Sequence, residues 1–342
     1  MHKFSSLIWI TIIIATKAIA TADDSAAIRV TVDNFIRAES DTYFARFVSQ
    51  GGFGKFHHER ELAPLDNQTV IRLNRDTLYS FGVFDLAAAP VMVTLPEVGR
   101  RYQALQVINE DHYAVEVVYA PGQYRFTKDQ VGTRYVVLAV RTFVNPNDPA
   151  DMKAVHALQD AIQVEQKEAG RFQAPHWDQS SLTKVREALL ALAAANGGLD
   201  SSRMFGRRGD VDVVQHLIGT AAGWGGNPQS AALYIGVEPK QNDGKTAYQL
   251  TVKDVPVDGF WSVSVYNQAG FFEKNSKNAY TFNNITAKPN ADHSVTIHFG
   301  GDENGVNFLP ISAGWNYTVR LYRPRKEVLA GTWKFPSAEP VK

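Results

Sequence analysis

Two series of short strand-like runs constrain the fold of this chain more than any other feature. The first series covers residues 70–143 and the second covers residues 247–334. Within each run, apolar or aromatic side chains alternate with small or polar ones, as Tyr79, Phe81 and Val83 do in the first series. Such alternation places one set of side chains on one face of a sheet. Short runs separated by Gly and Pro turns predict β-sandwiches or jelly rolls.

Helical patterns occur before and between the two series. Apolar residues recur at helical spacing over residues 25–48, 181–195 and 210–222, and Asp148-Pro149 is typical of a helix start. The 342 residues suggest about two domains. We therefore expect a mainly β fold with α, in which two β-sandwich or jelly-roll-like units are joined by a helical middle segment. The expected parts are a signal peptide (1–20), an N-terminal helix plus β domain (21–175), a helical connector (176–225) and a C-terminal β domain (226–342).

The N-terminus has the features of a secretory signal peptide. A short basic start, Met1-His2-Lys3, precedes an apolar run from Leu7 to Ala15, and small residues follow around Ala20 and Ala22. The run is shorter than the roughly 20 residues that span a bilayer. We expect cleavage near Ala20 or Ala22, a periplasmic or secreted location, and no membrane span in the mature chain. The alternative is an uncleaved N-terminal anchor.

Composition excludes several classes of function. The chain has 35 basic and 35 acidic residues, so its formal net charge is zero. This balance argues against a nucleic-acid partner, because such proteins usually carry a basic excess. There is no cysteine, which excludes disulfides, thiolate metal sites and a cysteine nucleophile. A small-molecule ligand is the expected partner, and a homo-oligomer is compatible with the composition.

The first candidate site is the segment that contains Asn74, Arg75, Asp76 and Tyr79. Arg75 is suited to a bidentate grip on a substrate carboxylate. Asp76, beside an arginine, is expected to stay ionised and to orient a substrate, a base or a metal. We assign catalytic roles to Arg75 and Asp76 and substrate-binding roles to Asn74 and Tyr79. The alternative is that the segment is only a turn, because Asn and Asp readily bond the local backbone.

The second candidate site is the run from Asn109 to Tyr113, which follows a predicted strand. A histidine with nearby carboxylates can be a general base or can bind a divalent metal. We assign catalytic roles to Asp111 and His112 and substrate-binding roles to Asn109 and Tyr113. Neighbouring residues of a strand face opposite ways, so a metal would need further ligands from elsewhere. The alternative is an ordinary polar strand end.

The third candidate set is aromatic and basic and lies in the C-terminal series. Trp261, Tyr266, Arg320 and Tyr322 could form an aromatic wall with a cation, which suits a carbohydrate, an aromatic acid or a lipid headgroup. The alternative is that they form a sandwich core and edge. Both series also close on a strand that carries an arginine, Arg141 in the first and Arg320 in the second, which is a weak sign of duplication.

Longer motifs resemble two known domain families. The run Leu73-Asn-Arg-Asp-Thr-Leu-Tyr-Ser80, with Phe84-Asp85-Leu86 and Pro90 after it, resembles the bacterial domain of unknown function numbered 1254. The run Gly259-Phe-Trp-Ser-Val-Ser-Val-Tyr266 resembles the companion domain numbered 1214, as do later motifs ending in Arg320-Leu-Tyr-Arg-Pro324. The resemblance covers nearly all of the mature chain. It implies two β units with helices between them and does not imply a reaction.

Two functions are compatible with these patterns. The first is a periplasmic enzyme acting on a small molecule by hydrolytic or acid–base chemistry, with or without a divalent metal, in a pocket that joins the first two candidate sites. In that enzyme Asp111 or His112 would be the base, and Arg75 would hold an anionic group. The second is a non-catalytic envelope protein, either ligand-binding or oligomeric. No nucleophile elbow, phosphate loop or zinc-protease motif is present to favour a specific enzyme class.

Overall fold

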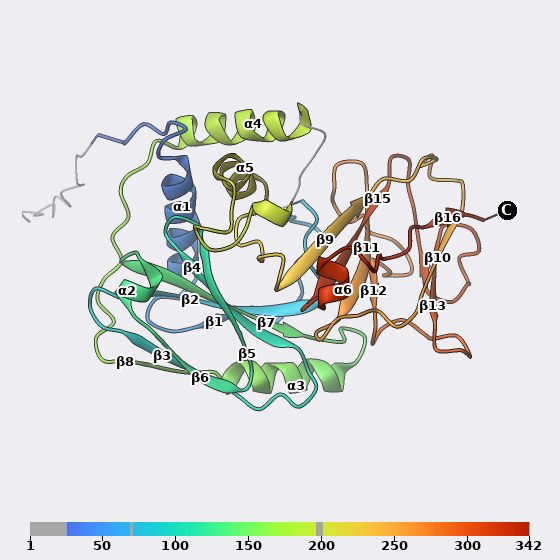
Figure 1. Cartoon of the computed structure of the whole chain (residues 1–342), viewed down its shortest axis with the longest axis horizontal. Helices are drawn as coiled ribbons and strands as arrows, with labels where there is room; N and C mark the ends of the chain where they lie inside the picture. The colour runs from blue at the N-terminus through green and yellow to red at the C-terminus, as the bar shows by residue number, and fades with distance from the viewer. Residues whose placement is uncertain (1–25, 69–70, 196–200, 342) are drawn as a thin grey trace, which may run out of the picture.

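The computed structural model describes residues 26–68, 71–195 and 201–341, so the expected signal peptide and its cleavage sites lie outside the described residues. Two β-rich halves lie side by side along the longest axis of the molecule (Figure 1). Each half contains two sheets with an apolar core between them. The prediction of a mainly β fold with two sandwich-like units is therefore confirmed.

The N-terminal half consists of a five-stranded antiparallel sheet, in the order β1-β2-β7-β4-β5, and a three-stranded sheet, in the order β6-β3-β8. Their facing side chains, such as Leu105, Leu138 and Val93, form one buried core. The strands are β1 (His57–His58), β2 (Thr77–Asp85), β3 (Val91–Leu95), β4 (Gln103–Asn109), β5 (Ala114–Tyr119), β6 (Gly122–Phe126), β7 (Tyr135–Phe143) and β8 (Gln163–Gln166).

Three helices cover the other face of the five-stranded sheet. They are α1 (Phe35–Ser49), α4 (Gln179–Ala195) and α5 (Val213–Gly223), and they pack on one another through their own apolar cluster. The segment expected to connect the two units thus belongs to this helical layer (Figure 1). The first helix begins ten residues later than its periodicity predicts, because Ile28 forms a β-bridge with Trp177 instead.

The helix expected after Asp148 is present as α3 (Pro149–Asp160). The Asp148 carboxylate accepts a hydrogen bond from the backbone N–H of Ala150 at 2.9 Å, and Pro149 occupies the first turn. Both features are the usual way to begin a helix. Shorter helical turns are α2 (Lys128–Val131), α6 (Lys326–Leu329) and the 3-10 turn η1 (Ser201–Arg203).

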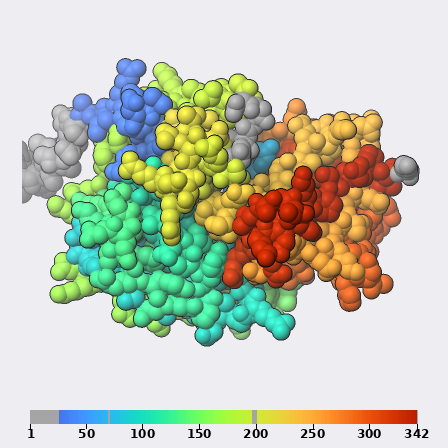
Figure 2. Space-filling view, viewed as in Figure 1, coloured from blue at the N-terminus to red at the C-terminus, as the bar shows by residue number. Residues whose placement is uncertain are grey.

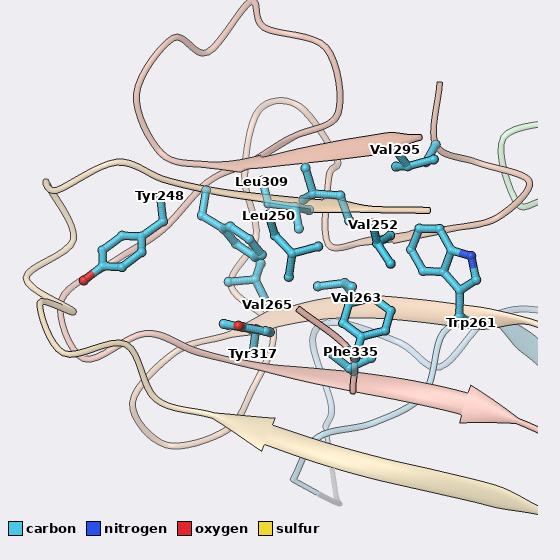
Figure 3. Close-up of a cluster of buried hydrophobic side chains, with 14 of the residues drawn as sticks. Tyr248, Leu250, Val252, Trp261, Val263, Val265, Val295, Leu309, Tyr317 and Phe335 are labelled. Atoms are coloured by element: carbon cyan, nitrogen blue, oxygen red, sulfur yellow. The ribbon is translucent and has the colours of Figure 1, made fainter. Parts of the chain in front are cut away.

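The C-terminal half consists of two four-stranded sheets, in the orders β14-β13-β10-β16 and β12-β11-β15-β9. Side chains such as Leu250, Val263 and Leu309 interdigitate between them (Figure 3). The strands are β9 (Ala232–Val237), β10 (Tyr248–Val252), β11 (Trp261–Tyr266), β12 (Thr281–Asn283), β13 (Val295–Phe299), β14 (Phe308–Leu309), β15 (Asn316–Tyr322) and β16 (Glu339–Pro340).

Most strands within residues 70–143 and 247–334 were expected, whereas the short or half-exposed strands β1, β6, β8, β9, β14 and β16 were not. These strands lack a run of alternating residues long enough to recognise. In the part of the chain that the structure describes, no helix is long and apolar enough to cross a membrane.

Candidate functional site

The two halves meet along a polar face of the β12-β11-β15-β9 sheet. Because the pleat alternates, Val263 and Val319 point into the C-terminal core, while Ser264 and Arg320 point out of it towards the N-terminal half. Segment 71–79 of the N-terminal half lies against this face. We call this contact the seam; in the space-filling view the two halves adjoin along their common boundary (Figure 2).

Arg320 joins the halves at the seam. Its guanidinium donates to the backbone carbonyl of Arg72 at 2.7 Å, to the hydroxyl of Ser264 at 3.0 Å and to the hydroxyl of Tyr266 at 2.8 Å. Tyr266 in turn donates to the carbonyl of Leu73 at 2.8 Å. Both side chains are buried. Tyr266 and Arg320, which the sequence assigned to the third candidate set, therefore bind segment 71–76 of the first candidate site.

Asp76 is completely buried in the seam. One carboxylate oxygen accepts a hydrogen bond from the Asn283 amide at 2.9 Å, while the other oxygen has no hydrogen-bond partner. The hydroxyl of Ser262 lies close by but outside hydrogen-bonding geometry, and it too has no partner. Burial raises the pKa of Asp76, and the charge of Arg320 offsets only part of this effect. The cation that acts on Asp76 is thus Arg320 of the C-terminal half.

Asn74 hydrogen-bonds both to the local backbone and to two neighbouring side chains. Its side-chain oxygen accepts from the backbone N–H of Asp76 at 2.9 Å, which is the turn expected as the alternative. Its amide nitrogen donates to Thr77 at 2.9 Å and to the phenol oxygen of Tyr79 at 3.2 Å. Tyr79 is paired in register with Arg141 of β7, whose guanidinium lies 5.4 Å from the centre of its ring. The first candidate site is thus a connected set of side chains.

Arg75 faces a pocket between the halves, with a volume of about 400 Å³. Its guanidinium donates to the carbonyl of Ala63 and lies 5.6 Å from the centre of the Tyr280 ring. Burial lowers its pKa from the usual value. Two further residues of the pocket lining, Thr281 and Asn283, donate hydrogen bonds to the carboxylate of Asp76. The remaining lining combines apolar groups with amides, the exposed carboxylate of Glu61 and an ion pair between Lys274 and Asp66.

The second candidate site lies at the other end of the five-stranded sheet. Leu78 and Gln103 are both paired with Thr142, whereas Asn109 is paired with Val136, six residues further along β7. Six residues of strand correspond to about 20 Å. The pocket that Arg75 lines includes none of residues 109–113, so the expectation that one pocket joins the first two candidate sites is wrong.

His112 is fixed within this second cluster. Its Nε2 accepts from the backbone N–H of Gly225 at 2.8 Å, so its proton is on Nδ1, which bonds the Thr220 hydroxyl at 2.8 Å. Burial lowers the pKa of His112 well below its usual value, and the neighbouring His216 adds to this effect. Every hydrogen-bonding atom of the ring is used and only 2% of the residue is exposed. The geometry fits a structural role rather than a catalytic base.

The other members of the second cluster are also engaged. Asn109 accepts from the backbone N–H groups of Asp111 and Tyr113, each at 3.0 Å. Asp111 pairs with Arg37 of α1 at 2.5 Å, and the Tyr113 ring stacks on His216. The alternative of an ordinary polar strand end therefore describes this cluster. Among the described residues, no group of three or more histidine, aspartate or glutamate side chains could hold a metal ion.

The third candidate set is divided between core and seam. Trp261 points into the C-terminal core against Phe335, so its assignment to a binding wall is corrected. Tyr322 lies at the seam, where its ring stacks on Phe260 at 4.2 Å. The change of face between Trp261 and Ser262 follows directly from the pleat.

The sequence also left several seam residues unassigned. These include Arg141, Asn283 and Ser262, which reach the site through strand pairing, and Tyr280, which directly precedes β12. Of these residues the sequence pointed only to Arg141, through the arginine that the two series share. A separate hollow of about 500 Å³ lies along β3 and β8. None of the candidate residues lines it, so the pocket at Arg75 is the better candidate site.

Comparisons with known proteins agree with this architecture. A family model described as a protein of unknown function, DUF1254, matches residues 53–166, and a second, DUF1214, matches residues 233–326. The chain combines a DUF1254 domain with a DUF1214 domain. The segment 71–79 belongs to the first domain and Arg320 to the second, so the seam is the contact between the two family domains.

Two solved structures have a similar fold. The VPA0106 protein from Vibrio parahaemolyticus is 20% identical, with a TM-score of 0.67 over 91% of this chain and 98% of its own. A putative uncharacterized protein from Burkholderia cenocepacia is 14% identical, with a TM-score of 0.53 over 90% of this chain and 87% of its own. No curated protein matches the sequence. At these identities the likeness establishes the fold alone.

Proposed function

We propose that this protein binds a small organic anion, such as a carboxylate, in the pocket between its DUF1254 and DUF1214 domains. The observation that carries the proposal is Arg75, a half-buried guanidinium that faces the pocket and, among the described residues, forms no ion pair with a carboxylate. Such a cation is a strong site for a bidentate anion because partial burial reduces its screening by water. The pocket volume lies within the range of small-molecule sites.

The charges of the seam support the same ligand class. The seam contains three guanidinium groups, those of Arg75, Arg141 and Arg320, and Arg320 acts on its buried carboxyl group, that of Asp76. The Lys274–Asp66 pair at the pocket is internally balanced. The exposed Glu61 also lines the pocket, so the excess of positive charge lies with the buried Arg141 and Arg320 of the seam.

Acid–base catalysis on the bound anion is a second candidate function. It is favoured by Asp76, whose pKa is raised by burial and whose bonded carboxylate oxygen accepts from Asn283 and Thr281, two residues of the pocket lining. A carboxyl group with a raised pKa can donate as well as accept a proton. The roles proposed from sequence for Asp111 and His112 do not belong to this pocket, since both lie at the opposite end of the sheet.

Calorimetric titration of the signal-less protein with paired probes tests the proposal. We expect benzoate and gluconate to bind, and the neutral amides of the same acids to bind at least tenfold more weakly. The variant Arg75→Gln should lose ten- to hundredfold in affinity, because a hydrogen bond to a charged group contributes about 1.5–3 kcal/mol. Arg125→Gln, at the hollow along β3, is the matched control and should bind as the wild type does. Equal binding by wild type and Arg75→Gln would exclude the proposed site.

We also propose that the protein acts in the periplasm or outside the cell. The basic and apolar N-terminus with small residues near Ala20 and Ala22 supports this location. N-terminal sequencing of the protein recovered from cell fractions tests it directly. A start after Ala20 or Ala22 in the extracytoplasmic fraction is expected, and an intact Met1 in the cytoplasm would contradict it.

A further inference from the structure

The pocket at Arg75 has apolar walls from both halves of the molecule. The half-buried side chains of Leu62 and Met152 line it and pack on a buried apolar cluster of the N-terminal half. Leu65 and Tyr280 also line it and pack in an aromatic cluster of the C-terminal half. The Arg75 guanidinium lies 5.6 Å from the centre of the Tyr280 ring. A ligand whose anionic group is held by Arg75 therefore meets apolar surface with the rest of its body.

Most hydroxyl and amide groups of the lining are already engaged within the protein. The hydroxyl of Thr286 donates to the side-chain oxygen of Asn283 at 3.0 Å, and the amide of Asn283 donates to Asp76 at 2.9 Å. The hydroxyl of Thr281 accepts from Ser264 at 3.0 Å and donates to Asp76 at 3.4 Å. A ligand with many hydroxyl groups would have to break these bonds to gain its own. The exchange yields little free energy, because each new hydrogen bond replaces an existing one.

The charged groups of the lining leave one cation free. Among the described residues, the cations of the lining are Arg75 and Lys274, and its carboxylates are Glu61 and Asp66. Lys274 is already paired with Asp66. A first carboxylate on the ligand can therefore pair with Arg75, whereas a second would find no free cation and would be repelled by Glu61. The lining thus fits a ligand with a single negative charge.

We propose that this pocket selects monocarboxylates with an apolar body, either an aromatic ring or a short alkyl chain, over sugar acids and dicarboxylates. The selectivity rests on the proposed function, because it requires Arg75 to hold the carboxylate. Its source is the apolar area that leaves water when the ligand body packs on Leu62, Met152 and Tyr280, a gain that a hydroxylated body does not have. The pocket of about 400 Å³ has room for a ring together with its carboxylate.

Calorimetric titration of the signal-less protein with three carboxylates tests this selectivity. Benzoate has one charge and an apolar ring, gluconate has one charge and a hydroxylated chain, and terephthalate adds a second carboxylate to the ring. We expect benzoate to bind about tenfold more tightly than either of the other two. Met152→Gln replaces apolar surface of the pocket with an amide of similar length. It should weaken benzoate binding by about three- to tenfold and leave gluconate binding unchanged.

Met92→Gln is the matched control, because Met92 is a half-buried methionine that lines the separate hollow along β3 and β8. It should change the affinity for none of the three probes. If Met152→Gln does not fold, Leu62→Gln should reduce the preference for benzoate in the same way.

The outcomes separate this selectivity from the proposed function. Gluconate or terephthalate bound as tightly as benzoate, with all binding still weakened by Arg75→Gln, would overturn the selectivity and leave the anion site intact. Benzoate binding that neither Met152→Gln nor Leu62→Gln weakens would overturn the selectivity as well. Binding of none of the three carboxylates would refute the anion site itself, and the selectivity with it.

Discussion

The two ends of the five-stranded sheet carry similar side chains and use them differently. At the end covered by α1 and α5, the cluster around His112 has a partner for each atom of the imidazole and an arginine for Asp111. At the seam, Asp76 and Ser262 each keep a buried oxygen without a partner, and Arg141 has only neutral acceptors. The number of polar residues in a segment of sequence therefore does not show whether that segment forms a structural cluster or a candidate site. The distinction lies in whether the hydrogen-bonding and charge requirements are met within the protein.

The largest expected loss of stability concerns the seam. Arg320→Ala should lower the free energy of unfolding by about 3–5 kcal/mol, because it removes the nearest cation from the buried Asp76 and leaves the carbonyl of Arg72 unpaired. Urea denaturation measures the loss. Arg323→Ala, a half-exposed neighbour over the Tyr119 ring, serves as control and should cost less than about 1 kcal/mol. A loss below about 1 kcal/mol for Arg320→Ala would show that the seam does not bind the halves together.

A somewhat smaller effect is expected at the opposite end of the sheet. His112→Ala should cost about 2–4 kcal/mol, since it opens a cavity and leaves the N–H of Gly225 without an acceptor. The same variant should bind carboxylate probes as tightly as the wild type when titrated well below its denaturation midpoint. A tenfold weaker affinity would mean that the two ends of the sheet are coupled and that the contrast between them is false.

A third prediction concerns pH and the helical layer. Burial raises the pKa of Asp41 on α1 to about 6, with Glu110 and Asp111 adding to the shift and Trp177 and Arg37 opposing it. Because the folded pKa lies above the unfolded one, the contribution of Asp41 to stability is present below about pH 4 and is lost as pH rises through 6. Asp41→Asn should therefore be more stable than the wild type above pH 6, by at most about 3 kcal/mol.

Urea denaturation at pH 4 and pH 7.5 measures this difference. The asparagine oxygen can still accept from the indole N–H of Trp177, which lies 2.8 Å from the carboxylate. The advantage of the variant should disappear at pH 4. A variant less stable than the wild type at pH 7.5 would show that the attraction between Asp41 and Arg37 outweighs burial.

The smallest expected changes in stability concern two serines of β11, whose side chains lie on the same face of the sheet. Ser264 accepts from Arg320 and donates to Thr281, each at 3.0 Å, so Ser264→Ala should cost about 1.5–3 kcal/mol. The hydroxyl of Ser262 has no partner, so Ser262→Ala should change stability by less than about 0.5 kcal/mol. Both residues are fully buried, which makes them a matched pair for urea denaturation. An equal loss in the two variants would mean that Ser262 bonds Asp76 and that the seam is as complete as the cluster around His112.

Most of the secondary structure could be predicted from local patterns. The strands β3, β10 and β13 show the alternation of buried and more exposed residues that a pleated sheet imposes, and Asp148-Pro149 marks the start of α3. The residues of the first candidate site were also recognisable, because Asn74, Arg75, Asp76 and Tyr79 lie within one short segment. Local sequence was sufficient here because the pleat and the helix start are properties of neighbouring residues.

Pairing between distant strands decided the remaining questions. The sequence by itself determined the mainly β class, the two family domains and the polar and aromatic residues from which a site could be built. The tertiary structure alone decided that Arg320 meets segment 71–76, that Arg141 lies over Tyr79 and that His112 is held by the backbone N–H of Gly225. The physical reason is that burial and charge compensation depend on groups brought together across the fold, and no local pattern encodes which of them will remain unpaired.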